Sequence, residues 1–326
     1  MTGIKEKLLA LVAPDLEKIE VALRNNLTPH LDLVRETAGH LMFAGGKRLR
    51  PLLIVLSARI CGHEDAFVSK FASIFEFLHT ATLLHDDVID GATVRRGKPV
   101  ANAVYGAPVT VLTGDFLLAR ALNIAAESES MRIIKVVSAM TETISQGEIH
   151  QLIKKGDLNF SEAEYMAVIR AKTGVLIQGA CKTGAILANA DEAAEEALSA
   201  YGDHLGLVFQ IADDILDYTA DTGELGKSVG ADLREGKLTL PVIHALKNAS
   251  PEDRARMAAI ITNTDFTREE FEMLLGLFDR YGGIAYAKDV AAAHVRKAKA
   301  RLTAFAPSQT REILEMMADY ALNRRA

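Results

Sequence analysis

Apolar residues recur at every third or fourth position along most of this chain, the spacing that places them on one face of an α-helix. In the first such stretch, residues 4–27, the recurring apolar positions are Leu8, Leu11, Val12, Leu16, Ile19 and Leu23. Pro14 lies inside this stretch and is expected to bend or split the helix, because proline lacks a backbone N–H. No stretch alternates apolar and polar residues between turn signals, so the pattern predicts an all-α fold with no sheet of consequence.

Glycine, proline and capping residues mark where further helices begin and end. Gly45-Gly46 follows one helix, Pro51 suits the first turn of the next, and Ser161 and Glu164 have the spacing of a capping box. The further predicted helices cover residues 29–44, 51–61, 68–89, 108–126, 131–154, 161–188, 193–218, 240–248, 268–281 and 284–305. Several are apolar almost all round, which favours a large helical assembly with a buried centre over a thin four-helix bundle.

Length and composition limit the class of protein. A chain of 326 residues is long for one ordinary domain and compatible with two, but no linker-like composition divides it, so we expect one helical domain over residues 1–326. With 49% hydrophobic and 25% charged residues, the chain is not of the disordered class. Its net charge of −6 argues against overall attraction to nucleic acid or anionic lipid, so any anion site must be local.

The sequence also bears on the cellular compartment. The two cysteines, Cys61 and Cys181, match no metal-binding spacing and cannot form a disulfide framework, which favours a reducing compartment. The longest stretch without Asp, Glu, Lys or Arg, residues 99–114, is broken by Pro108 and is shorter than the roughly 20 residues that a membrane span needs. Residues 1–11 lack the apolar region of a secretory signal. We therefore expect a cytoplasmic protein without a transmembrane segment.

Two acidic pentads carry the strongest chemical signal. Asp86-Asp87-Val88-Ile89-Asp90 ends one apolar helix, and Asp213-Asp214-Ile215-Leu216-Asp217 repeats the pattern at the end of another. Residues i and i+4 share a helix face, so each pentad gathers like charges at a helix C-terminus, where the macrodipole also disfavours them. If the pentads were only solvated helix ends, each of the two would carry both the like-charge repulsion and the unfavourable interaction with the macrodipole. Mg²⁺ with a polyphosphate would relieve them, since Mg²⁺ binds one or two carboxylates plus phosphate oxygens and waters, and the spacing does not fit a calcium loop.

Positive charge occurs in small clusters near helix ends and in loops. The clusters are Lys47, Arg48 and Arg50; Arg95 and Arg96; Lys172; and Lys227 and Lys237. Each cluster alone is most often a solvated surface patch, but beside two acidic motifs they favour phosphate binding, which suits the planar fork of arginine. The last pair lies in a glycine-rich irregular segment, residues 219–239, whose length indicates a function and makes it a candidate lid.

Taken together, these stretches resemble the trans-polyprenyl diphosphate synthases over nearly the whole chain. The matching segments are GGKRLRP (45–51), FLHTATLLHDDVIDGATVRRGKP (77–99), GDFLLARA (114–121), KTG (172–174), FQIADDILD (209–217) and LGKSVGADLREGKLTLP (225–241). The sequence is most similar to the long-chain bacterial enzymes that make octaprenyl or decaprenyl diphosphate. The resemblance implies a single large helical-bundle domain of the isoprenoid synthase type with a central cavity, a Mg²⁺ cofactor and a homodimer.

The resemblance also implies roles for individual residues, in three groups. Asp86, Asp90 and Asp213 would bind Mg²⁺ against the allylic diphosphate, with support from Asp87, Asp214 and Asp217. The allylic diphosphate would contact Arg95, Lys172, Gln210, Lys227 and Lys237, of which Lys172 and Lys227 also count as catalytic. Isopentenyl diphosphate would be bound by Lys47, Arg50, His79 and Arg96. A histidine on an apolar helix is more often structural, and this is our expectation for His85, whereas the FLHT match assigns His79 to the site.

The implied reaction adds isopentenyl diphosphate repeatedly to farnesyl or geranylgeranyl diphosphate. The C40–C50 product would serve as a quinone side-chain precursor and leave with transient membrane contact. The growing chain would pass Ala81 and Thr82, one to two turns before Asp86, and then Ile124, Ala125 and Val137. In shorter-chain relatives a bulky aromatic residue commonly closes this path.

Three alternatives stay open on the sequence. A shorter-chain farnesyl or geranylgeranyl diphosphate synthase would share every motif named above. A terpene cyclase would share the metal motifs, but it has no need of GGKRLRP or Arg96. A non-catalytic partner subunit would be expected to have degraded aspartate motifs, and both are intact here.

Overall fold

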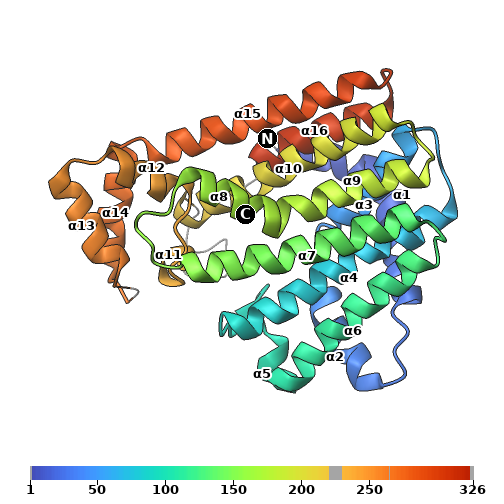
Figure 1. Ribbon diagram of the computed structural model, residues 1–326, viewed down its shortest axis with the longest axis horizontal. Helices are drawn as coiled ribbons and strands as arrows, with labels where there is room; N and C mark the ends of the chain where they lie inside the picture. Colours follow the sequence, from blue (N-terminus) through green and yellow to red (C-terminus); the bar gives the residue numbers. More distant parts are fainter. Residues whose placement is uncertain (1, 220–229, 264, 324–326) are drawn as a thin grey trace. The chain divides into compact units, whose positions relative to one another are not determined.

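The computed structural model describes residues 2–219, 230–263 and 265–323, and most of these residues are helical. The predicted all-α fold is confirmed (Figure 1). The helices are α1 (Thr2–Asn26), α2 (Asp32–Met42), α3 (Leu49–Ile60), α4 (Ala66–Ile89), α5 (Ala101–Tyr105), α6 (Ala107–Ala126), α7 (Met131–Lys154), α8 (Glu162–Ile169), α9 (Val175–Leu187), α10 (Glu192–Thr219), α11 (Ala231–Arg234), α12 (Leu240–Asn248), α13 (Pro251–Ile261), α14 (Arg268–Arg280), α15 (Gly283–Arg301) and α16 (Gln309–Asn323).

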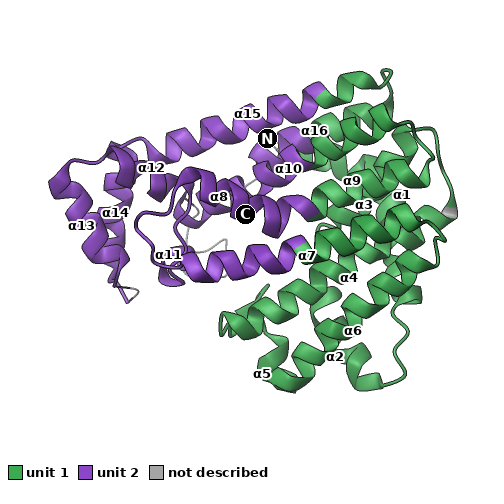
Figure 2. Cartoon of the chain, in the orientation of Figure 1, with its two compact units in different colours: residues 1–142, 176–202, 301–316 green, residues 143–175, 203–300, 317–326 purple. Residues whose placement is uncertain are grey.

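The chain divides into two compact units, each assembled from separate stretches of sequence (Figure 2). Unit 1 comprises residues 1–142, 176–202 and 301–316, and unit 2 comprises residues 143–175, 203–300 and 317–326. In unit 1, α4 packs against α1, α3 and α6 around fully buried side chains such as Phe75 and Phe77. In unit 2, α12 packs against α8 and α14 around a core that includes Leu207, Ile211 and Phe278. The single domain over residues 1–326 stays a prediction.

Several helix boundaries follow from the local signals. Ser161 accepts a hydrogen bond from the backbone N–H of Glu164, and Glu164 accepts one in return, which completes the predicted capping box. Pro51 lies in the first turn of α3, as predicted. Pro14, by contrast, does not split α1, which runs unbroken from Thr2 to Asn26. Burial of Val12, Ile19 and Leu23 on the inward face supports the helix on both sides of the proline.

Other expectations need correction. The helix predicted over residues 161–188 is interrupted by a π-helical turn, Arg170–Gly174, between α8 and α9. Helices α13 and α16 were not predicted, and neither were the short helices α5 and α11. In the described part of the chain the sheet is confined to β1 (Val94–Arg95) and β2 (Lys98–Pro99), an antiparallel hairpin turned by Arg96 and Gly97 at φ values of 53° and 73°. Positive φ at both central residues is what a two-residue hairpin requires.

One helix bears on membrane association. Among the described residues, α6 is the single helix long and apolar enough to cross a membrane by length and composition, although no such segment was expected from the sequence. The core helix of a soluble protein meets the same criteria.

Candidate active site

A histidine surrounded by arginines forms the basic cluster of unit 1. His79 lies on α4, Arg50 in the first turn of α3, and Arg95 and Arg96 on the hairpin. Burial, followed by the charges of Arg50, Arg96 and Arg95, lowers the pKa of His79 well below its usual value. The ring is therefore neutral at physiological pH and sits in a field that attracts anions. The structure thus brings together three of the four residues predicted to bind isopentenyl diphosphate.

The fourth, Lys47, is exposed on the loop that joins α2 to α3. Arg96 reaches this loop, because its Nη1 donates to the carbonyl oxygen of Gly45 and lies 3.5 Å from that of Leu41. A Cβ at Gly46 would lie 3.2 Å from Nη1 of Arg48 and 3.4 Å from Nη1 of Arg96. Gly46 therefore lets two guanidinium groups lie against the backbone of the loop.

The first acidic pentad ends α4, and its carboxylates differ in environment. Asp87 is 1% exposed, and its Oδ1 accepts a hydrogen bond of 2.7 Å from Nε of Arg95. Asp86 and Asp90 are partly exposed. The implied roles, in which Asp86 and Asp90 bind metal and Asp87 supports them, stay a prediction. Since Nε of Arg95 donates to Asp87, contact of Arg95 with an allylic diphosphate would use the remaining N–H groups of its guanidinium.

His85, on the same helix, contacts α6. Its Nε2 lies 3.1 Å from the carbonyl oxygen of Val111 and 3.4 Å from Oδ1 of Asp115. A Cβ at Gly114 would lie only 2.3 Å from this Nε2, so the glycine makes room for the ring. These contacts support the expected structural role of His85.

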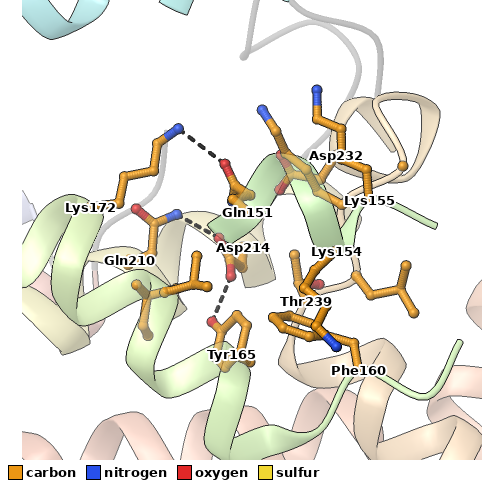
Figure 3. Close-up of a pocket in the computed structure, with 15 residues that line it drawn as sticks. Gln151, Lys154, Lys155, Phe160, Tyr165, Lys172, Gln210, Asp214, Asp232 and Thr239 are labelled. Atoms are coloured by element: carbon orange, nitrogen blue, oxygen red, sulfur yellow. Dashed lines mark hydrogen bonds between the residues drawn. The ribbon is translucent and has the colours of Figure 1, made fainter. Parts of the chain in front are cut away.

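Unit 2 contains a cavity of about 90 Å³ that gathers the second set of predicted residues (Figure 3). Lys172, Gln210, Asp214 and Lys237 all line it. Asp214 is 3% exposed and accepts hydrogen bonds from the Tyr165 hydroxyl at 2.6 Å and from Nε2 of Gln210 at 2.7 Å. Burial raises the pKa of Asp214 to about 7, since the charges of Asp213 and Asp217 add to the effect and the two hydrogen bonds only partly oppose it.

The π-helical turn places Lys172 at this cavity and Thr173 against Gln210, another of the residues that line it. Nζ of Lys172 lies 2.7 Å from Oε2 of Glu148 and 3.1 Å from Oε1 of Gln151. The hydroxyl of Thr173 donates to Oε1 of Gln210 at 2.8 Å, which orients the amide so that its nitrogen faces Asp214. Single π-helical turns are common at functional sites, because the extra residue changes where side chains point. Both Lys172 and Gln210 are thus held by protein partners in the orientation seen here.

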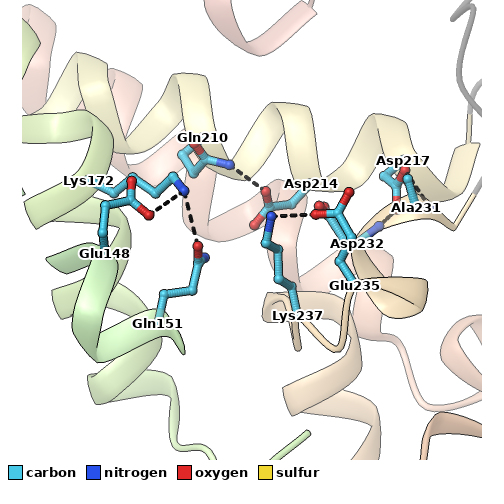
Figure 4. A network of polar contacts seen from close by, with 10 residues as sticks. All are labelled: Glu148, Gln151, Lys172, Gln210, Asp214, Asp217, Ala231, Asp232, Glu235 and Lys237. Carbon is cyan, nitrogen blue, oxygen red and sulfur yellow. Dashed lines mark hydrogen bonds and ion pairs between the residues drawn. The ribbon is translucent and has the colours of Figure 1, made fainter. Parts of the chain in front are cut away.

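The acidic cluster extends from α10 to α11 (Figure 4). Asp217 accepts hydrogen bonds from the backbone N–H groups of Ala231 and Asp232, at 3.2 and 3.1 Å, and so caps α11. Burial and the charges of Asp214 and Asp217 raise the pKa of Asp232 well above its usual value, while Lys237 opposes the shift. Lys237 also pairs with Glu235. Lys227 and the other residues from 220 to 229 of the glycine-rich segment that was expected to be a lid lie outside the described residues.

Some residues at this site were not predicted. Asp232 lies within the quoted stretch 225–241, so the motif itself could have indicated it. Tyr165, Glu148 and Gln151 occupy ordinary helical positions without a local signal. Their part in the site depends on which helices pack together.

The carboxylates of the two pentads are the type of ligand that hard divalent cations prefer. Among the described residues no group of three or more His, Cys, Asp or Glu side chains is arranged to hold a metal ion. Burial is the main cause of the raised pKa of Asp214, and the charges of Asp213 and Asp217 add a repulsion that a cation would relieve. Mg²⁺ normally takes few protein carboxylates and completes its shell with phosphate oxygens and waters. The residues present therefore fit a metal bound together with a diphosphate.

The residues predicted to line the growing chain belong to unit 1. Ala81 on α4, Ile124 and Ala125 on α6, and Val137 on α7 are fully buried. Thr82 is partly buried, and its hydroxyl donates to the carbonyl oxygen of His79 at 2.8 Å. Their burial shows that these side chains lie in the core of the unit, and a tunnel past them stays a prediction.

Comparisons with known proteins identify relatives of the whole chain. Residues 31–277 match the family model described as polyprenyl synthetase. An octaprenyl diphosphate synthase of Escherichia coli (strain K12) is 37% identical over 319 residues, covering 98% of each chain. A short chain isoprenyl diphosphate synthase of Methanothermobacter thermautotrophicus is 38% identical over 306 residues, covering 92% of each. The crystal structure of a polyprenyl synthase from Caulobacter crescentus CB15, complexed with calcium and isoprenyl diphosphate, superposes with a TM-score of 0.93 at 40% identity, covering 98% of each chain.

Proposed function

We propose that this chain, which belongs to the polyprenyl synthetase family, is a long-chain all-trans polyprenyl diphosphate synthase, a prenyltransferase that adds isopentenyl diphosphate repeatedly to an allylic diphosphate. The observation that carries the proposal is the basic cluster of His79, Arg50, Arg95 and Arg96 in a chain that also carries both aspartate pentads. A terpene cyclase has no need of that cluster. A partner subunit without activity has no need of intact pentads.

The proposed reaction depends on stabilising a leaving group. The allylic C–O bond breaks, and its electron pair leaves with the diphosphate, whose charge Lys172, Lys237 and Arg95 balance. Mg²⁺, held by Asp86, Asp90 and Asp213 with support from Asp87, Asp214 and Asp217, would supply further positive charge at that diphosphate. The double bond of isopentenyl diphosphate attacks the allylic cation and forms the new C–C bond. A proton is then lost, for which the released diphosphate is the proposed acceptor.

Isopentenyl diphosphate is assigned to the basic cluster and Lys47. Neutral His79 can donate one hydrogen bond without competing for the cations, and Arg50 and Arg96 supply fixed charge. We expect Arg50→Ala to raise the KM for isopentenyl diphosphate by about tenfold or more, with a much smaller change for the allylic substrate. Initial rates with each substrate varied in turn measure the two constants. Arg35→Ala, which removes an exposed ion pair with Asp32, is the control, and an equal rise of both constants in Arg50→Ala would show that the sites are misassigned.

One incubation separates the functional classes. Purified protein is mixed with farnesyl diphosphate, labelled isopentenyl diphosphate and Mg²⁺, and the products are separated by chromatography. Linear elongation to C40–C50 is the expected result. A C15 or C20 product would instead support a shorter-chain synthase, the alternative favoured by the Methanothermobacter relative. A cyclised hydrocarbon would identify a terpene cyclase, and no product would support a partner subunit.

The proposed enzyme is a homodimer. Val104 on α5 and Val111 and Leu112 on α6 are exposed apolar side chains on adjoining helices, with Leu112 66% exposed. Apolar surface of this kind is typical of an interface between subunits. We expect light scattering to give a mass of twice 35.3 kDa, and a mass of 35.3 kDa at working concentration would contradict the proposal. A cytoplasmic location, transient membrane contact at product release and a quinone side-chain precursor as product belong to the same proposal.

A further inference from the structure

Arg48 is the residue of the basic loop to which the proposed function assigns no role. It stands between Lys47 and Arg50 in GGKRLRP and precedes α3 in the left-handed conformation, with φ of 46°. Whereas Lys47 is exposed, the side chain of Arg48 is only 5% exposed. The loop therefore turns one of its three cations inward.

Three oxygen atoms from three parts of unit 1 accept hydrogen bonds from the guanidinium group of Arg48. Nε donates to Oε1 of Glu20 on α1, Nη1 donates to Oε1 of Glu76 on α4 at 2.7 Å, and Nη2 donates to the carbonyl oxygen of Met42 at 2.8 Å. Burial alone would lower the pKa of Arg48, but the hydrogen bonds and charges of Glu20 and Glu76 outweigh it and raise the pKa. With every nitrogen engaged and the side chain buried, Arg48 is not placed to bind a diphosphate itself.

Each residue of the proposed isopentenyl diphosphate site is connected to this buried group. Lys47 directly precedes Arg48 in the chain, and Arg50 follows it by two residues. His79 follows Glu76 by one helical turn on α4, so the ion pair fixes the loop to the segment that carries the imidazole. Arg96 donates to the carbonyl oxygen of Gly45, and its Nη1, like that of Arg48, lies against Gly46. The ion pairs of Arg48 therefore connect the segments that carry the residues assigned to isopentenyl diphosphate.

Without Arg48, the carboxylate of Glu76 would compete with the substrate diphosphate for the cations of the site. It is 4% exposed, and its charge acts on Arg96 as well as on Arg48. A buried carboxylate without Arg48 would take the nearest cation, and the candidates are those assigned to the substrate. The pairing with Arg48 gives Glu76 a partner outside the set of residues assigned to the substrate.

We propose that Arg48 is a positioning residue of the isopentenyl diphosphate site, which it assembles by fixing the segment GGKRLRP, with Lys47 and Arg50, to Glu20 and Glu76. The inference rests on the proposed function, because the site is defined by that reaction. A lysine is not equivalent at this position, because one ammonium group cannot reach three acceptors in the directions of a guanidinium fork.

The test compares two conservative variants, one at Arg48, directly before α3, and one at Arg59 on α3. We expect Arg48→Lys to raise the KM for isopentenyl diphosphate about tenfold, with kcat and the KM of the allylic substrate changed less than about twofold. Arg59→Lys is the matched control, because Arg59 on α3 also pairs with a carboxylate of α1, Asp15, through two hydrogen bonds of 2.5 and 2.9 Å. Both variants are expected to lower the melting temperature, but only Arg48→Lys should change the KM.

The experiment distinguishes failure of this inference from failure of the proposed function. Wild-type protein that makes no prenyl product would refute the proposed function, whereas the inference is judged only in an active enzyme. Equal changes of the isopentenyl diphosphate KM in Arg48→Lys and Arg59→Lys would reduce Arg48 to a structural ion pair and overturn the inference. If Arg48→Lys fails to fold, Glu20→Gln takes its place, since Glu20 is 38% exposed and its loss is tolerable. A rise of about threefold in the same KM is then expected, and an unchanged KM would overturn the inference.

Discussion

Replacing Asp213 with alanine is expected to lower turnover at least about a hundredfold while the helical fold is retained, because the variant removes a carboxylate assigned to the metal. Asp213 is exposed on α10, so its removal opens no cavity. Its charge is also one of the causes that raise the pKa of buried Asp214, so removing it relieves repulsion rather than adding strain. The same loss of turnover is expected for Asp86→Ala in the other pentad.

Circular dichroism and steady-state kinetics together test this expectation. A second readout is independent of turnover: Mg²⁺ with inorganic diphosphate should raise the melting temperature of the wild type and not that of Asp213→Ala. Asp289→Ala, which removes an exposed carboxylate from α15, is the matched control and should behave as wild type. Activity near that of the wild type in either Asp213→Ala or Asp86→Ala would contradict the assignment of these carboxylates to the metal.

Helices with strong local signals were predictable from the sequence almost to the residue. Residues 131–154 and 240–248 coincide with α7 and α12, since apolar spacing and flanking breakers define both. Helix α13 was missed because PEDRARMAAII is mostly charged or small and buries little beyond Met257, Ile260 and Ile261. The π-helical turn Arg170–Gly174 has no sequence signature at all, because it adds a residue without breaking the apolar pattern.

The chemistry of the site was predictable in kind, but the partner of each side chain was not. The family resemblance placed Arg50, His79 and Arg96 in one group, and the structure brings them together. Nothing in GGKRLRP distinguishes Arg48, which turns inward, from Lys47, which is exposed. The difference arises from Glu20 and Glu76, each 28 residues away along the chain, and such pairings exist only once helices pack.

The same limit applies to Asp214. The pentad predicts a carboxylate near a metal, but burial beside Tyr165 and Gln210 decides that its pKa rises to about 7. Within one pentad, Asp213 is exposed and Asp214 is buried. Sequence spacing identifies the face of the helix, whereas the packing of α8 and the π-helical turn against α10 separates the roles of adjacent aspartates.

Product length should respond to Ala81. This residue lies on α4 between His79 and the first pentad, is fully buried, and belongs to the same unit as Ile124, Ala125 and Val137. A growing chain that leaves the allylic diphosphate and passes this face of α4 meets no aromatic side chain at any of these positions. Ala81→Tyr would place a ring in that path, and we expect the product to shorten sharply from C40–C50 while allylic diphosphate is still consumed, since no residue assigned to the metal changes.

Overpacking has to be separated from obstruction, because a tyrosine in a filled core costs about 1–3 kcal/mol wherever it is placed. Ala72 provides the control: it is also fully buried on α4, and nine residues along the helix it points about 180° away from Ala81. Both variants should lower the melting temperature, but only Ala81→Tyr should shorten the product in the chromatographic assay. If Ala81→Tyr still makes the wild-type length, the chain does not pass this face of α4. If Ala72→Tyr shortens the product equally, the effect is one of core packing, and the path must be sought elsewhere.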